Sequence, residues 1–179
     1  MQMSTTLSVY LIEFQQMSES FFGALVMLNA LMVVFLQISI SDWASKQPLL
    51  LMMICGSAFY LVGFGSYGLP PSIPLFVIAM ILITLGEMLV IPTSQALTAL
   101  LAPLDMRARY VATERLTLIV AQSLGPLAAG AVMDHFDPRW VWYGCSMICV
   151  ISILGFSVLH VNSRARLKEA SIPGAEERS

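Results

Sequence analysis

One acidic residue inside an apolar stretch has the clearest potential for chemistry in this sequence. Glu87 lies within the apolar segment 74–101, with apolar neighbours for at least one helical turn on either side. An ionised carboxylate in hydrocarbon is costly, so this side chain must face protein, water or a counter-charge. We interpret Glu87 as a proton-linked or cavity-lining acid. The alternative is a structural pair or hydrogen bond with a neighbouring helix.

Three side-chain amides also lie within apolar segments. Asn29 and Gln37 belong to the segment 21–40, and Gln122 belongs to the segment 110–133. Each amide could face a cavity. Each could equally form a hydrogen bond between helices, because polar side chains are buried in membranes with partners.

The residues that enzymes and metal sites need do not occur in recognisable patterns. His135 and His160 are far apart, and there is no phosphate-binding glycine loop, nucleophile elbow or HExxH motif. Cys55, Cys145 and Cys149 lie in apolar runs without accompanying histidines or carboxylates. The net charge of −2 gives no basic surface for nucleic acid. We therefore expect no enzyme activity, no metal, no cofactor and no nucleic-acid partner.

The composition identifies the elements that must position these residues. The 179 residues are 58% hydrophobic and 11% charged, with a mean hydropathy of +0.80, whereas soluble domains carry roughly 25% charged residues. A bilayer core requires roughly 20 apolar residues per helix, and helices satisfy their own backbone groups in lipid. The sequence therefore predicts an all-α integral membrane bundle. Its five full transmembrane helices are expected at about 21–40, 49–66, 74–101, 110–133 and 140–161.

Both ends of the chain differ from these five segments. Residues 7–14 are apolar but span only about half a bilayer. We interpret residues 1–20 as the end of a partial N-terminal membrane helix followed by a turn, with an interfacial amphipathic helix as the alternative. Residues 162–179 are polar and contain Pro173 and Gly174. They are predicted to form a disordered tail.

The distribution of basic residues predicts the orientation in the membrane. Only Arg139 lies on one side, and the opposite side holds the other eight of the nine basic residues: Lys46, Arg107, Arg109, Arg115, Arg164, Arg166, Lys168 and Arg178. Cytoplasmic loops carry an excess of Lys and Arg, so the C-terminus is expected to be cytoplasmic. Trp140, Trp142 and Tyr143 suit the opposite interface, where aromatic side chains are enriched.

Small residues and prolines suggest where helices pack and bend. Ala121, Gly125 and Ala129 recur every four residues and form one small-residue stripe, close to Gly130 and Pro126. This face could let another helix slide, with ordinary static packing as the alternative. Pro92 is expected to kink the helix that holds Glu87.

Charged residues cluster in the turns expected on the cytoplasmic side. They are Asp42, Lys46, Asp105, Arg107 and Arg109. An acid at one helix end and arginines at another could form a breakable ion-pair latch. The alternative is that the basic residues serve membrane orientation alone.

Several of these residues, in this order, resemble the major facilitator superfamily over nearly the whole chain before the tail. The sequence Leu85-Gly86-Glu87 with Pro92, followed by 101–103 and 107–110, is similar to its helix ten and the next loop. Residues 123–130, Ser-Leu-Gly-Pro-Leu-Ala-Ala-Gly, are similar to helix eleven. Asp42 and Lys46 keep one acid and one base of the superfamily motif Gly-x-x-x-Asp-Arg-x-Gly-Arg-Arg, although its other positions differ.

This resemblance implies the C-terminal half, helices seven to twelve, of a transporter most similar to the drug:proton antiporter branch. It implies alternating access between two six-helix halves, with Glu87, Asn29 and Gln122 as candidates to meet substrate or proton. The expected function is proton-coupled export of small, drug-like amphipathic molecules across the cell membrane. The expected partners are lipid, substrate, protons and the N-terminal half. The chain could be a fragment, a truncated gene product or a half-transporter. A non-transporting helix bundle that regulates a partner is the alternative.

Overall fold

The computed structural model describes residues 2–103 and 105–170, and the side chains of residues 5–103 and 105–162. The described chain forms helices joined by short turns. In chain order they are α1 (Gln2–Val9), the π-helical turn η1 (Tyr10–Phe14), α2 (Glu19–Ser45), α3 (Leu49–Tyr67), α4 (Ile73–Leu101), α5 (Arg107–His135) and α6 (Arg139–Ala170). Among the described residues, five helices, α2 to α6, are long and apolar enough to cross a membrane. The predicted all-α membrane bundle is confirmed.

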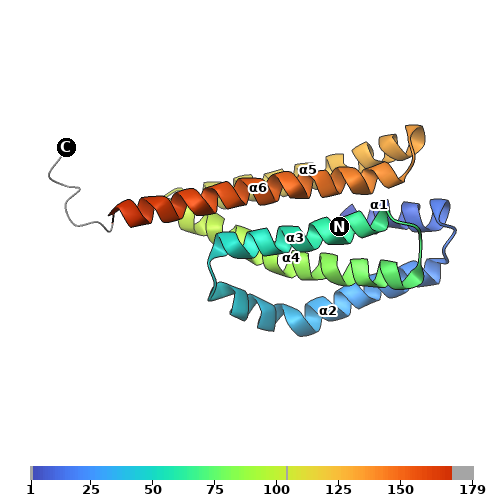
Figure 1. Cartoon of the computed structure of the whole chain (residues 1–179), viewed down its shortest axis with the longest axis horizontal. Helices are drawn as coiled ribbons and strands as arrows, with labels where there is room; N and C mark the ends of the chain where they lie inside the picture. The colour runs from blue at the N-terminus through green and yellow to red at the C-terminus, as the bar shows by residue number, and fades with distance from the viewer. Residues whose placement is uncertain (1, 104, 171–179) are drawn as a thin grey trace.

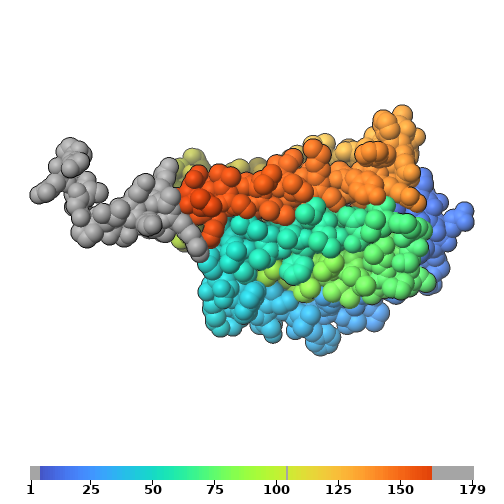
Figure 2. Space-filling model, in the orientation of Figure 1, coloured from blue at the N-terminus to red at the C-terminus, as the bar shows by residue number. Residues whose placement is uncertain are grey.

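The helices differ in how closely they pack. α3 has its most extensive contacts with α4 and α6, and α2 packs mainly against α4 (Figure 1). In the space-filling view, α6, α3, α4 and α2 form successive bands across the visible face (Figure 2). α5 runs beside α6 and has lighter contacts with α1, α4 and α6. The bundle therefore has a well-packed part, formed by α2, α3, α4 and α6, and a more exposed helix, α5.

The close contact between α3 and α4 depends on two glycines. A Cβ atom at Gly86 would lie 2.8 Å from the Gly56 carbonyl oxygen and 3.3 Å from Tyr60. A Cβ atom at Gly56 would lie 2.6 Å from the Val90 side chain. Small residues let helix backbones approach closely in membranes. Gly86 and Gly56 therefore lie opposite each other where α3 and α4 come close together.

The short N-terminal segment packs into the core. Leu7 and Leu11 are 0% exposed. The Tyr10 hydroxyl donates a 2.9 Å hydrogen bond to the Tyr67 carbonyl oxygen at the end of α3, and the Tyr10 ring meets the Trp142 ring edge-on, with centroids 5.2 Å apart. The apolar side chains of this segment therefore contact protein, whereas a helix lying at the membrane surface would bury them in lipid.

Two helices extend beyond their predicted ends. α2 continues to Ser45 and α6 continues to Ala170, because neither extension contains Gly or Pro and helix-forming residues continue past the apolar stretch. Residues 162–170 of the predicted disordered tail are thus helical, and residues 171–179 lie outside the described residues. The predicted helices ended where hydropathy fell, whereas the described helices continue beyond that point.

Candidate functional site

Glu87 lies at the centre of the candidate site, on α4. Its side chain is half-buried between Gly86 and Met88, both of which are buried. Among the described side chains, no ion pair or hydrogen bond reaches its carboxylate. Tyr60 of α3 lies within electrostatic range of it. Within the part of the chain that the structure describes, this acid therefore has no neutralising partner, although its helix is of membrane-spanning length.

Asn29 takes part in the contact between α2 and α4. Its Nδ2 atom donates a 2.9 Å hydrogen bond to Thr84 Oγ1, and the Thr84 hydroxyl donates to the Met80 carbonyl oxygen at 2.8 Å. Thr84 is 0% exposed and precedes Glu87 by about one helical turn, so both side chains lie on neighbouring positions of α4. Asn29 is thus bonded to α4 at Thr84, about one helical turn before Glu87 along that helix.

The other two amides form no hydrogen bond with α4 in the described chain. Gln122 is exposed on α5 and has no hydrogen-bond partner among the described residues. The Gln37 amide nitrogen donates to the Ser41 hydroxyl, 2.8 Å away on the same helix. Of the three predicted pathway residues, Asn29 contacts α4 one turn before Glu87, whereas Gln122 is exposed on α5.

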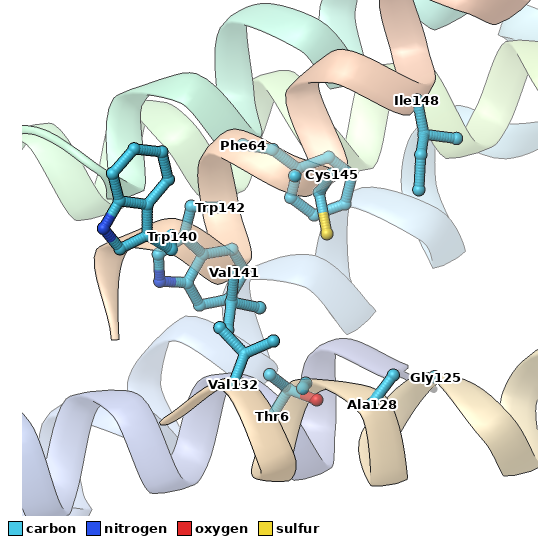
Figure 3. Close-up of a pocket in the computed structure, with 12 residues that line it drawn as sticks. Thr6, Phe64, Gly125, Ala128, Val132, Trp140, Val141, Trp142, Cys145 and Ile148 are labelled. Atoms are coloured by element: carbon cyan, nitrogen blue, oxygen red, sulfur yellow. The ribbon is translucent and has the colours of Figure 1, made fainter. Parts of the chain in front are cut away.

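A separate apolar cavity of about 280 Å³ lies between α1, α3, α5 and α6. Figure 3 shows Phe64 and Cys145 on one side, and Ala128 and Val132 of α5 on the other. The lining residues are Thr6, Phe64, Gly125, Ala128, Ala129, Val132, Trp140, Val141, Trp142, Gly144, Cys145 and Ile148. None of the predicted pathway residues lines it, so the cavity and the acid are separate features.

The predicted small-residue stripe of α5 borders this cavity only in part. Ala129 is buried and Gly125 lines the cavity, whereas Ala121 is exposed. A Cβ atom at Gly130 would meet no atom within 4 Å. Two of the three stripe residues thus face neighbouring helices or the cavity, and the Ala121 end of the stripe is open in the described chain.

Pro92, the predicted kink residue, and Pro126 both lie inside their helices. Pro92 belongs to α4 and Pro126 to α5. Proline has no backbone N–H, so each removes one helical hydrogen bond and crowds the preceding turn. Next to Pro92, the buried Thr93 hydroxyl donates to the Leu89 carbonyl oxygen. The carbonyl that loses its backbone donor at Pro92 is that of Met88, so this side-chain bond lies one residue beyond it.

The charged turn residues do not form a bridge between helices in the described chain. Lys46 Nζ lies 2.8 Å from Asp42 Oδ2, one turn away on α2, and the two side chains are 68% and 69% exposed. Such pairs are well solvated and contribute little to stability. Asp105, Arg107 and Arg109 are exposed, and none has an ion pair among the described residues. The Asp42 carboxylate is thus engaged within its own helix.

A second polar contact was not predicted from the sequence. The Ser94 hydroxyl of α4 donates a 2.9 Å hydrogen bond to Glu114 Oε1 of α5, and both side chains are half-buried. The available signal was the antiparallel hairpin that two adjacent helices form, because Ser94 and Glu114 are equally distant from its turn. Hydropathy alone gave no indication of which faces of the two helices meet.

These features define an integral membrane helix bundle with an unpaired acid and two proline-interrupted helices. The sequence model of the Major Facilitator Superfamily matches residues 1–178. The chain therefore belongs to this superfamily, whose members are transporters rather than enzymes. The family supports the expectation that the chain is a multi-pass membrane protein without enzyme activity.

Two relatives give the extent of the similarity. The chain is 28% identical over 154 residues to an uncharacterized MFS-type transporter, YttB, of Bacillus subtilis (strain 168), covering 85% of this chain and 38% of that protein. It is 24% identical over 147 residues to a Na⁺, Li⁺, K⁺/H⁺ antiporter of Planococcus maritimus, covering 82% of this chain and 32% of that protein. The chain thus spans about a third of the length of these relatives. No solved structure is significantly similar to it.

Proposed function

We propose that this chain is the C-terminal half of a proton-coupled exporter of the superfamily. In this assignment α1 and η1 are the end of helix seven, and α2 to α6 are helices eight to twelve. The share of each relative that the chain covers is consistent with one half of a two-half transporter. The substrate site then lies between this half and the N-terminal half.

The observation that carries the proposal is the unpaired, half-buried carboxylate of Glu87. A lone acid in a membrane-spanning helix has a high energetic cost. Acids of this kind mark proton relays and substrate paths. Within the proposal, Glu87 binds a proton in one state of the transporter and releases it in the other. The Planococcus maritimus relative supports proton coupling, because it is a Na⁺, Li⁺, K⁺/H⁺ antiporter.

The exported cargo is proposed to be a small, drug-like amphipathic molecule. The antiporter of Planococcus maritimus favours a second candidate cargo, a monovalent alkali cation. We further propose a cytoplasmic C-terminus in the cell membrane, because eight of the nine basic residues fall on one side of the predicted topology.

The decisive experiment compares Glu87→Gln with the unaltered protein in liposomes, with the N-terminal half present. We expect Glu87→Gln to abolish transport driven by a pH gradient, because glutamine has nearly the same shape but cannot carry a proton. The two cargo classes are offered separately, as a fluorescent lipophilic cation and as Na⁺ or K⁺, while an enclosed dye reports proton movement.

A matched control is Glu13→Gln, which changes an exposed acid at the end of η1. We expect this variant to transport at the normal rate. Transport unchanged in Glu87→Gln would remove the proton role of this residue. If neither cargo moves although the protein is folded, the alternative of a non-transporting helix bundle that regulates a partner is favoured.

A further inference from the structure

The hairpin of α4 and α5 is bridged by the hydrogen bond between Ser94 and Glu114. Ser94 lies seven residues before the end of α4, and Glu114 lies seven residues after the start of α5. At 1.5 Å per residue, the bond is about 10 Å from the turn along both helices. Because α4 and α5 otherwise have few contacts, this bond is a substantial part of what holds them together.

The chemistry of the bond makes it strong for a single contact. A hydroxyl that donates to an ionised carboxylate forms a charge-assisted hydrogen bond, roughly twice as strong as a neutral one. The donor–acceptor distance of 2.9 Å is within the normal range, and both side chains are half-buried. Partial burial limits the competition from water for both groups.

The position of the bond along α4 gives it a mechanical consequence. Ser94 follows Pro92 by two residues, so it belongs to the part of α4 beyond the interrupted turn. Before Pro92, the helix is fixed to α3 at Gly86 and to α2 through Thr84. Beyond it, Thr93 is the last residue of α4 that is fully buried among the described side chains. The end of α4 therefore depends on α5 for its orientation.

We propose that Glu114 is a positioning residue that holds the end of α4 against α5 through Ser94 and so sets the bend of α4 at Pro92. This inference rests on the proposed transport function, since the bend matters there by linking the movement of α5 to the helix that holds Glu87. The bond itself is tested independently of transport.

The test measures the distance between the end of α4 and the middle of α5 by electron paramagnetic resonance. Spin labels are placed at Leu100→Cys and Leu124→Cys, whose parent side chains are 72% and 58% exposed, after the three native cysteines are replaced. We expect Ser94→Ala and Glu114→Ala each to lower the population of the short-range conformer by roughly three- to tenfold, the net effect of one partly solvated hydrogen bond to a charged group. The double variant is expected to change no further, because both substitutions remove the same bond.

Two controls separate this role from general loosening of the helices. Ser123→Ala removes a hydroxyl that bonds to the Ile119 carbonyl oxygen within α5, and it is expected to leave the distance unchanged. Glu114→Gln keeps an acceptor oxygen and is expected to show a smaller shift than Glu114→Ala. Unchanged distances in both alanine variants, or effects that add in the double variant, would overturn the proposal.

A transport measurement connects the bond to function. We expect Ser94→Ala to lower the turnover number with little change in KM, because Ser94 acts on helix movement rather than on binding. If the distances change while transport does not, the bond exists and its link to transport is wrong. If Glu87→Gln also transports normally while the distances change, the proton proposal fails and the positioning role of Glu114 stands.

Discussion

Adding one methyl group at Gly86 tests whether the contact between α3 and α4 depends on the absence of a side chain. In Gly86→Ala the new Cβ atom would lie 2.8 Å from the Gly56 carbonyl oxygen, closer than real Cβ atoms approach. The obstacle is a backbone atom, so no side-chain rotation relieves it. The helices must separate by a few tenths of an ångström, and overpacking of this kind costs about 1–3 kcal/mol.

Helix propensity acts in the opposite direction, and a matched variant removes it from the comparison. Replacing a helical glycine by alanine favours the helix by about 1 kcal/mol. Gly130→Ala gains the same term, but its Cβ atom would meet no atom within 4 Å. The difference in unfolding free energy between the two variants therefore isolates the steric cost. We expect Gly86→Ala to be about 1–3 kcal/mol less stable than Gly130→Ala.

Thermal unfolding in a mild detergent measures this difference. For a chain of this size, 1 kcal/mol corresponds to about 2–4 °C in Tm, so Gly130→Ala should melt several degrees above Gly86→Ala. Gly56→Ala provides a check from the opposite helix, because its Cβ atom would meet the flexible Val90 side chain at 2.6 Å and the Gly86 carbonyl oxygen at 3.1 Å. Equal Tm values for Gly86→Ala and Gly130→Ala would refute the close contact between the two helices.

Three further predictions concern the polar contacts and the size of the protein. Asn29→Ala should lower stability by about 1 kcal/mol and should show little further effect in a Thr84→Val background, since the two residues share one interhelical bond; additive losses would contradict this. Lys46→Ala should change stability by less than about 1 kcal/mol, because its ion pair with Asp42 is well solvated; a larger loss would indicate an unseen partner. An antibody to residues 164–179 should detect a band near twice 19.6 kDa in native membranes; a band at 19.6 kDa would favour a separate half.

The spanning helices were predictable because backbone N–H and C=O groups in lipid must form hydrogen bonds within the segment. Apolar stretches of sufficient length must be helical in a bilayer, and the segment 74–101 corresponds closely to α4 (Ile73–Leu101). Glu87 could be selected as a candidate site residue for the same reason, because an acidic residue is rare among apolar neighbours. Helix ends were less predictable, because α6 continues to Ala170 on helix propensity after its hydropathy has fallen.

The contacts between helices were not predictable from spacing alone. The stripe of Ala121, Gly125 and Ala129 indicates a flat face on α5, but the sequence does not say which helix approaches it, and the Ala121 end of that face is open in the described chain. The close approach instead occurs where Gly86 meets Gly56. Pairing depends on how each helix is rotated about its axis, and many rotations satisfy the same hydropathy pattern.

The order of features along α4 suggests different roles in the proposed transporter for the parts of the helix before and after Pro92. Gly86 and Thr84 fix the first part to α3 and α2, and Glu87 lies within this fixed part. Pro92 then interrupts the helix, and Ser94 joins the second part to α5. In the mechanism that we propose, bending at Pro92 moves the end of α4 together with α5, while the proposed proton-binding acid stays with α2 and α3. Since α5 is also the least buried of the helices next to α4, it is the element that can move at the smallest loss of packing.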